Sequence, residues 1–195
     1  MLHTTTTGQW FDTSDGMHWW FDSGSVALDF AYTGGFDHPL QPTRSPEALA
    51  AWLSERFAGI DGVVTDRDEA DAQALRAAIA RMAVAASHNQ PPAPEDVDMV
   101  NLFAATPDIP PSLAGGSRRA GRSTARVSQA LSAMARESVE LFDVSERGRI
   151  RECAADDCQL VFYDESRSNN RRWCSMQRCG NRAKVRAHRA AARAE

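Results

Sequence analysis

The chain has 195 residues, of which 43% are hydrophobic and 25% are charged, and its formal net charge is −4. This composition is typical of a folded globular protein and excludes a largely disordered chain. No apolar run approaches the roughly 18 residues of a membrane-spanning helix, so we expect no membrane span. The N-terminus has neither a basic start nor an apolar segment, which argues against secretion and makes a cytoplasmic location our expectation.

The first 33 residues are predicted to hold an arm and a small β element. Residues 1–16 are polar and rich in threonine, which predicts a flexible N-terminal arm. The segment MHWWFDSGSVALDFAYT over 17–33 combines aromatic and β-branched residues around a Ser-Gly-Ser turn. We therefore expect one or two short strands in this segment.

Four helices are predicted downstream from their starts and their apolar periodicity. Ser45 and Pro46 have the residue types of an N-cap and a first helical position. Thr65 and Asp68 have the spacing of a capping box at the start of a longer helix. We therefore expect a mainly helical domain over 17–147. The predicted helices cover 45–57, 65–87, 94–105 and 124–143.

All four cysteines lie in the last quarter of the chain. Four residues separate Cys153 from Cys158, four separate Cys174 from Cys179, and fifteen lie between the two pairs. Two close pairs at such a distance are typical of a tetrahedral zinc site with four thiolate ligands. Disulfides and incidental buried thiols are the alternatives, and a reducing cytoplasm disfavours disulfides. We predict one structural Zn²⁺ with these four residues as its ligands.

The chemistry of this cysteine set argues against catalysis. Four thiolates fill a tetrahedral shell and leave no open position for the water that a hydrolytic zinc needs. The CxxC pattern of thiol redox proteins is absent, as are a P-loop, a nucleophile elbow and an HExxH motif. We therefore predict no catalytic residues and expect that the protein is not an enzyme.

The residues around the cysteines predict a treble-clef-like zinc finger over 148–195. Apolar and polar residues alternate on both sides of the first pair, as in a β-hairpin. The residues after Cys174 have the composition of a helix, so this finger should consist of a hairpin followed by a basic C-terminal helix. From Ser166 onward the chain holds nine basic residues and one acid, a charge of +8, which leaves −12 for the rest.

The basic helix has two predicted faces at about 100° per residue. The arginines share one face, and small residues from Met176 to Ala194 share another, which we expect to pack on the hairpin or on the acidic body. The arginine face suits DNA phosphates, and a neighbouring strip suits base edges. A solvated face, or one bound to the acidic body, is the alternative. The predicted DNA-binding residues are Arg178, Asn181, Arg182, Lys184, Arg186, His188, Arg189 and Arg193.

Two parts of the sequence resemble known families. CGNRAKVRAHR at 179–189, preceded by RRWCSM, closely resembles the CGNR zinc-finger family. VALDFAYTGG, SPEALAAWL, ALRAAIARM and VNLFAAT resemble the ABATE domain that accompanies this finger. The resemblance implies a bacterial, stress-induced transcription regulator with a DNA-binding finger and the four cysteines as zinc ligands. Members commonly carry asparagine where this chain has Tyr32.

The role of the N-terminal domain is the most open part of the prediction. Joined to a DNA-binding finger, it is expected to sense a small molecule or to form a homodimer. An aromatic ligand pocket is one interpretation of its large side chains, and a hydrophobic core is the other. An alternative for the whole protein is a small-molecule-binding protein or an enzyme in which the zinc finger is only structural. The candidate ligand-binding residues are Trp20, Phe30, Tyr32 and Trp52.

Overall fold

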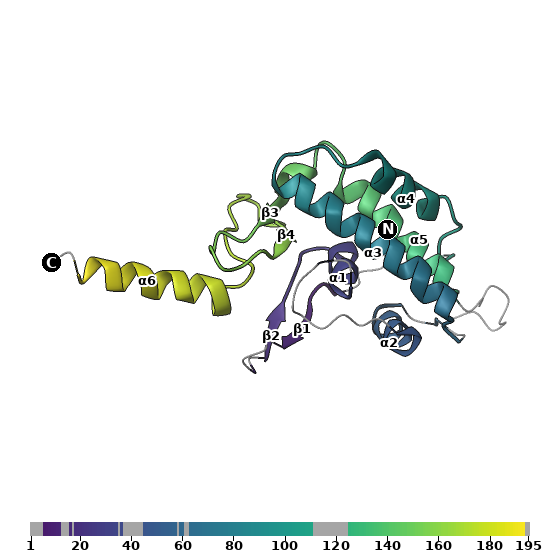
Figure 1. The fold of residues 1–195 in the computed structure, drawn as a ribbon, viewed down its shortest axis with the longest axis horizontal. Coiled ribbons are helices and arrows are strands. Elements are labelled where there is room, and N and C mark those ends of the chain that lie inside the picture. Colours follow the sequence, from purple (N-terminus) through teal and green to yellow (C-terminus); the bar gives the residue numbers. More distant parts are fainter. Residues whose placement is uncertain are drawn as a thin grey trace.

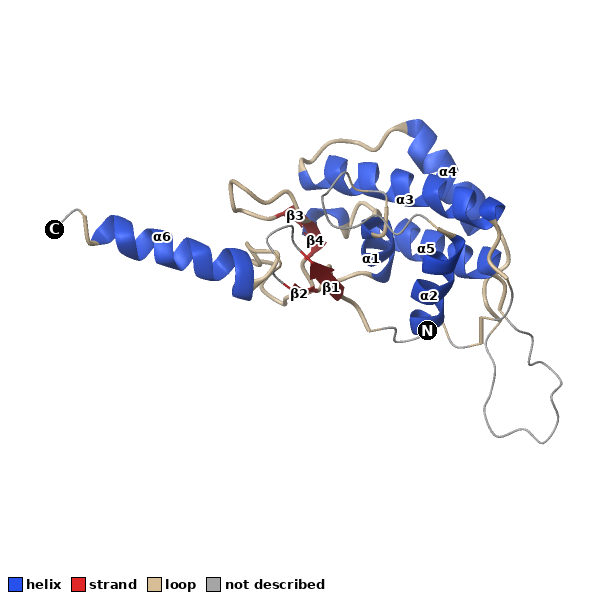
Figure 2. Cartoon of the chain, turned by 60° about the horizontal axis from the view of Figure 1, so that its bottom comes forward, coloured by secondary structure: helices blue, strands red, loops and turns tan. Residues whose placement is uncertain are grey.

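The fold is a mainly helical body with small β-hairpins and a hairpin-plus-helix zinc module, as predicted (Figure 1). It was obtained as a computed structural model, which describes residues 6–12, 16, 18–34, 36, 45–57, 59–60, 63–110 and 125–193. The hairpins lie between the body and helix α6 (Asn181–Ala191), which extends away from both (Figure 2). Within the described residues, no helix has the length and apolar character needed to cross a membrane.

The body is built around α3 (Asp66–Ser87), which contacts the four other helices of the body. Its capping box is formed as predicted, because Thr65 Oγ1 accepts from the Asp68 N–H at 3.2 Å and Asp68 Oδ2 accepts from the Thr65 N–H at 2.9 Å. Leu75 and Ile79 on α3 are fully buried, and Leu131 on α5 (Val127–Leu141) is 2% exposed. The four helices predicted from periodicity are therefore confirmed. The helices of the body are α1 (Val26–Tyr32), α2 (Pro46–Arg56), α3 (Asp66–Ser87), α4 (Pro94–Ala104) and α5 (Val127–Leu141).

The prediction of a flexible arm over 1–16 is wrong for residues 9–12, and the prediction of one or two short strands over 17–33 is confirmed for one strand, β2. Strand β1 (Gln9–Asp12) pairs antiparallel with β2 (His18–Phe21), so 9–12 is not part of a flexible arm. The buried side chain of Phe11 on one face of this hairpin stabilises β1, although the sequence before and after this strand is polar. The segment after the Ser-Gly-Ser turn is α1 and not a strand, with Ser25 as its N-cap. All seven residues of α1 are buried, and a helix without a polar face gives no amphipathic period to read.

A buried carboxylate fastens the start of β1 to α1. Asp29 is fully buried and accepts hydrogen bonds from the Gly8 N–H at 2.5 Å and from Ser23 Oγ at 2.7 Å. Its backbone carbonyl accepts from Gln9 Nε2 at 2.8 Å. Burial raises the pKa of Asp29 to about 7, although the hydrogen bond from Ser23 opposes this rise. Gly8 and Gln9 therefore have a fixed place against α1.

The zinc module begins with a short 3-10 turn, η1 (Arg147–Arg149), and an antiparallel pair of strands, β3 (Ile150–Glu152) and β4 (Val161–Tyr163). A π-helical turn, η2 (Met176–Gly180), leads directly into α6. The predicted order of hairpin and helix is thus present.

A second hydrophobic cluster joins the body to this module, and we call it the zinc-side cluster. Tyr32 of α1 takes part, and its hydroxyl donates to the Val161 carbonyl at 2.9 Å and accepts from the Val161 N–H at 2.7 Å. Tyr32 therefore anchors the body to β4. Gly24, with φ of +76°, lies so close to Tyr163 that a Cβ would be 2.4 Å from its carbonyl oxygen. The buried members of the cluster are Phe11, Trp19, Phe21, Tyr32, Leu160, Phe162 and the four cysteines.

Candidate zinc centre and basic helix

The four cysteine side chains converge in the zinc module, although they come from two segments. Cys153 follows β3 and Cys158 closes the turn beyond it, while Cys174 precedes η2 and Cys179 lies within it. Their sulfur atoms all lie within 4.8 Å of one another, and all four residues are buried. The sulfur of Cys174 is 3.7 Å from that of Cys158 and 3.5 Å from that of Cys179. Four sulfurs at zinc-ligand distance from one centre would be about 3.8 Å apart, so the geometry fits zinc.

Backbone hydrogen bonds hold the two segments in register. The Cys174 N–H donates to Cys153 Sγ at 3.4 Å, and the Ala154 N–H donates to the Arg172 carbonyl at 2.8 Å. Arg171 adds a side-chain clamp, since its guanidinium donates to the Cys174 carbonyl at 2.6 Å and to the Asp22 carbonyl at 2.7 Å. The cysteine site is therefore tied both to itself and to the N-terminal hairpin.

Charge also favours a cation at the centre of the four sulfurs. Hydrogen bonding with Cys158 lowers the pKa of Cys153, whereas hydrogen bonding with Cys153 raises the pKa of Cys174 well above its usual range. The thiols on their own thus share negative charge instead of all ionising, because neighbouring thiolates repel. A divalent ion removes this conflict and allows four thiolate ligands.

Comparison with protein families agrees with this geometry. The CGNR zinc finger matches residues 149–192. The ABATE family, described as "Putative stress-induced transcription regulator", matches residues 24–143, which is more than half of the chain. The chain belongs to the ABATE family. No curated protein gives a significant match. Together with the clustered sulfurs, the zinc-finger match identifies the C-terminal site of this ABATE protein as a site for one structural zinc ion, as predicted.

The predicted DNA-binding residues fall into two groups. Arg178 is half-buried, with its guanidinium carbon 5.0 Å from the centre of the Trp19 ring. Arg182 and Arg186 both reach Asp157, at 2.8 Å and 3.4 Å. Arg178 therefore packs on the protein, and Arg182 and Arg186 are paired with one of its carboxylates, as one of the alternatives anticipated. The remaining five are exposed, and they are Asn181, Lys184, His188 and Arg189 on α6 and Arg193 after its end.

The small-residue face of the helix does not pack as expected. Helix α6 has no buried residue, and both Ala187 and Ala190 are exposed. Ala183 is half-buried beside the cysteine turn, and the helix then leaves the module (Figure 1). The prediction that this face packs on the hairpin or the body is therefore wrong beyond the first turn. Amphipathic periodicity identified the small-residue face of α6 correctly. What lies against that face depends on the direction in which α6 leaves η2, and periodicity does not give this direction.

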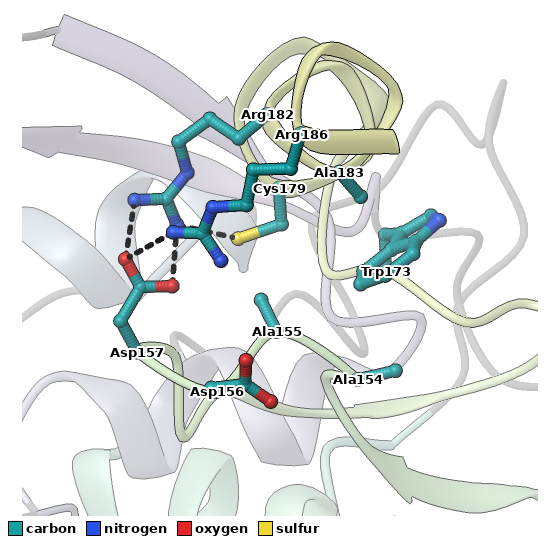
Figure 3. A pocket seen from close by; sticks show the side chains of 9 residues that line it. All are labelled: Ala154, Ala155, Asp156, Asp157, Trp173, Cys179, Arg182, Ala183 and Arg186. Carbon is teal, nitrogen blue, oxygen red and sulfur yellow. Dashed lines mark hydrogen bonds and ion pairs between the residues drawn. The ribbon is translucent and has the colours of Figure 1, made fainter. Parts of the chain in front are cut away.

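Two residues next to the last cysteine have local structural reasons for their type. A Cβ on Gly180 would lie 2.6 Å from the sulfur of Met176, so the glycine lets this flexible side chain lie close against the turn. Arg182 donates from Nη2 to Cys179 Sγ at 3.2 Å, as well as to Asp157. Arg182, Asp157 and Cys179 border a hollow of about 200 Å³ between the 154–157 turn and α6 (Figure 3).

Asp157 is the residue of this site that the sequence analysis missed. It holds two arginines of the basic helix, and no motif in the sequence points to it. The sequence feature that could have indicated Asp157 is the acidic pair Asp156 and Asp157, which lies inside a basic module and directly before a predicted zinc ligand. An acid in such surroundings indicates an ion pair with the nearby arginines.

The candidate ligand-binding aromatics do not come together in one pocket. Phe30 and Trp52 pack in the helical core, with ring centres 5.4 Å apart. Tyr32 belongs to the zinc-side cluster and stacks on Phe36. Trp20 lies on the β1–β2 hairpin and is 38% exposed. The prediction of a shared aromatic site is wrong, and Phe30, Tyr32 and Trp52 serve the alternative role of core residues.

Proposed function

We propose that this ABATE protein is a DNA-binding transcription regulator whose helix α6 contacts the DNA backbone. The observation that carries the proposal is the state of α6, which buries no residue and extends away from the body. All five charged side chains between residues 181 and 193, in α6 and just after it, are basic. Such a surface attracts polyanions, and phosphate contacts are the main source of affinity for duplex DNA.

The lack of packing along α6 supports the proposal that this helix binds a partner molecule. The helix has 11 residues, and helices shorter than about 12–15 residues are marginal in water without tertiary contacts. Among the described residues, Lys184, Arg189 and Arg193 have no ion pair within the protein, in contrast to Arg182 and Arg186. Their charges are thus available to an anionic partner, and the major groove of DNA admits a helix of this width.

The two groups of basic residues refine which side chains would touch DNA. Arg189 and Arg193 are exposed and would contact phosphates, together with Lys184. Asn181 and His188 are also exposed, and their side chains can hydrogen-bond to base edges or phosphates. Arg178 would contribute little because its guanidinium packs on Trp19.

The zinc in this proposal is structural, and the protein is not an enzyme. Four thiolate ligands complete a tetrahedral shell, and such a shell has no place for a bound water. The helical body would sense a small molecule or form a homodimer, which are the roles expected of the domain coupled to a DNA-binding finger.

The test uses the full chain with zinc and a DNA sequence obtained by selection from a random pool. Arg189→Ala removes an exposed charge from α6, and Arg67→Ala removes an exposed charge from α3 as the matched control. Plots of log affinity against log salt should be shallower by about 0.9 for Arg189→Ala and unchanged for Arg67→Ala. Failure to select any DNA, or equal slopes for the parent and Arg189→Ala, would contradict the proposal.

A further inference from the structure

We infer that Arg182 is a positioning residue of the zinc centre, which holds the Cys179 thiolate in place with the help of Asp157. This assignment goes beyond the proposed function, because it transfers a residue from the predicted DNA surface to the metal site. It depends only on the geometry around the last cysteine.

The Arg182 guanidinium makes a three-point contact (Figure 3). Its Nη1 donates to Asp157 Oδ2 at 2.8 Å, and its Nη2 donates to Asp157 Oδ1 at 3.3 Å. The same Nη2 lies 3.2 Å from Cys179 Sγ, which is within hydrogen-bond distance for sulfur. Both Nη atoms of the guanidinium are thus held by the Asp157 carboxylate, and Nη2 also points at the Cys179 sulfur.

The helix supplies this arrangement by its spacing. Arg182 follows Cys179 by three residues, so both side chains lie on the same side of the turn. Cys179 is fully buried and lies in a π-turn, where the backbone leaves the regular helical path. A hydrogen bond from the next turn fixes the direction of the sulfur toward the other three cysteines.

The negative charge of a four-thiolate zinc site explains why the hydrogen bond from Arg182 to Cys179 matters. Four thiolates and one Zn²⁺ carry a net charge of −2, and charged donors make the stronger hydrogen bonds to anionic acceptors. Groups that hydrogen-bond to metal ligands orient them, and their loss typically weakens metal binding by 10- to 100-fold. The half-exposed pair of Arg182 and Asp157 would stabilise little by itself, so its effect lies in the orientation of the sulfur.

Arg186 strengthens the hold on Asp157 from the following turn. Its Nη2 lies 3.4 Å from Asp157 Oδ2, so one carboxylate of the 154–157 turn receives two arginines of α6. Arg189 and Arg193 make no such contact among the described residues. The arginine face therefore divides into a first part that serves the zinc centre and a second part that is open to solvent.

The experiment measures zinc affinity of the full-length protein by competition with a chelator of known affinity. Arg182→Ala should bind zinc 10- to 100-fold more weakly than the parent, with Arg189→Ala as the matched control at parental affinity. Arg182→Lys, whose ammonium reaches fewer acceptors, should fall between these two. Asp157→Ala should lose affinity in the same direction as Arg182→Ala and to a smaller extent, since Arg182 keeps its place near the sulfur.

Cobalt substitution separates positioning from general folding. At saturating Co²⁺, the thiolate-to-cobalt absorption of Arg182→Ala should move to lower energy, because its sulfur has lost a hydrogen bond. The band of Arg189→Ala should stay in place. Equal zinc affinity and equal cobalt spectra in Arg182→Ala and Arg189→Ala would overturn the inference, and so would a full loss in Arg182→Lys.

The outcome is separable from that of the proposed function. A weaker zinc site in Arg182→Ala together with unchanged DNA binding in Arg189→Ala would support this inference and contradict the DNA-binding proposal. Unchanged zinc binding in Arg182→Ala with reduced DNA binding would do the opposite and return Arg182 to the DNA surface.

Discussion

Helices α5 and α6 are both amphipathic, yet they hold their places in different ways. Helix α5 has 15 residues and buries nine of them in the body, whereas α6 has 11 residues and buries none. What fixes α6 is its N-terminal end, where Cys179 of η2 lies in the zinc-side cluster and Arg182 in the first turn of α6 pairs with Asp157. The same periodic pattern thus describes a core helix and a projecting one, and a single metal site replaces the packing that α6 lacks.

Removal of zinc should have the largest effect, because it should unfold the zinc module that holds α6 and leave α5 in place. Cys174→Ser, or a strong chelator, should unfold the zinc module because structural zinc contributes on the order of 10 kcal/mol. The zinc-side cluster contains Trp19, so the fluorescence emission of the protein should shift to longer wavelength. The circular dichroism of helices α1 to α5 should stay. Ser168→Ala, at an exposed position in the same module, serves as the control. Parental emission in zinc-free protein would contradict this account.

Truncation of one apolar side chain in each helix tests the comparison directly. Leu131→Ala in α5 should lower the free energy of unfolding of the body by about 3 kcal/mol, because it leaves a cavity in the helical core. Val185→Ala in α6 should change it by less than about 0.5 kcal/mol, since Val185 is 48% exposed. Urea denaturation measures both values, and a similar loss in the two variants would show that α6 packs after all.

A single hydroxyl tests how firmly the body holds the zinc module. Tyr32→Phe leaves the buried N–H and carbonyl of Val161 without their side-chain partner, which should cost about 1–3 kcal/mol. Tyr163→Phe removes a hydroxyl whose partner is the partly exposed Glu146 carboxylate, so its effect should be smaller. Urea denaturation compares the two variants, and equal losses would mean that Tyr32 is not the anchor between α1 and β4.

The sequence predicted those elements whose pattern is local. The helices α2 to α5 have capping residues or a clear apolar period, and the capping box at Thr65 and Asp68 is present as expected. The spacing of the cysteines predicted their convergence, because a tetrahedral metal site restricts how two pairs can meet. Helix α1 was missed because it is buried on every side, and β1 because its four residues follow a polar segment.

The contacts that divide the arginine face could not be predicted, since they join distant parts of the chain. Arg178 stacks on Trp19 from the N-terminal hairpin, and Arg182 meets Asp157 across the zinc module. Periodicity places both arginines on one helical face but does not say which partner lies opposite each of them. The aromatic residues were harder still, because a large buried side chain has the same appearance in a core and in a pocket.

Hydrogen exchange in the presence and absence of selected DNA tests the central claim most directly. The backbone amides between Lys184 and Ala191 should exchange more slowly when DNA is bound, because α6 gains the contacts that it lacks within the protein. The amides of α5 should exchange at unchanged rates. Protection confined to the body, with α6 exchanging as fast as in the free protein, would contradict the account of α6 as a zinc-anchored DNA-contacting helix.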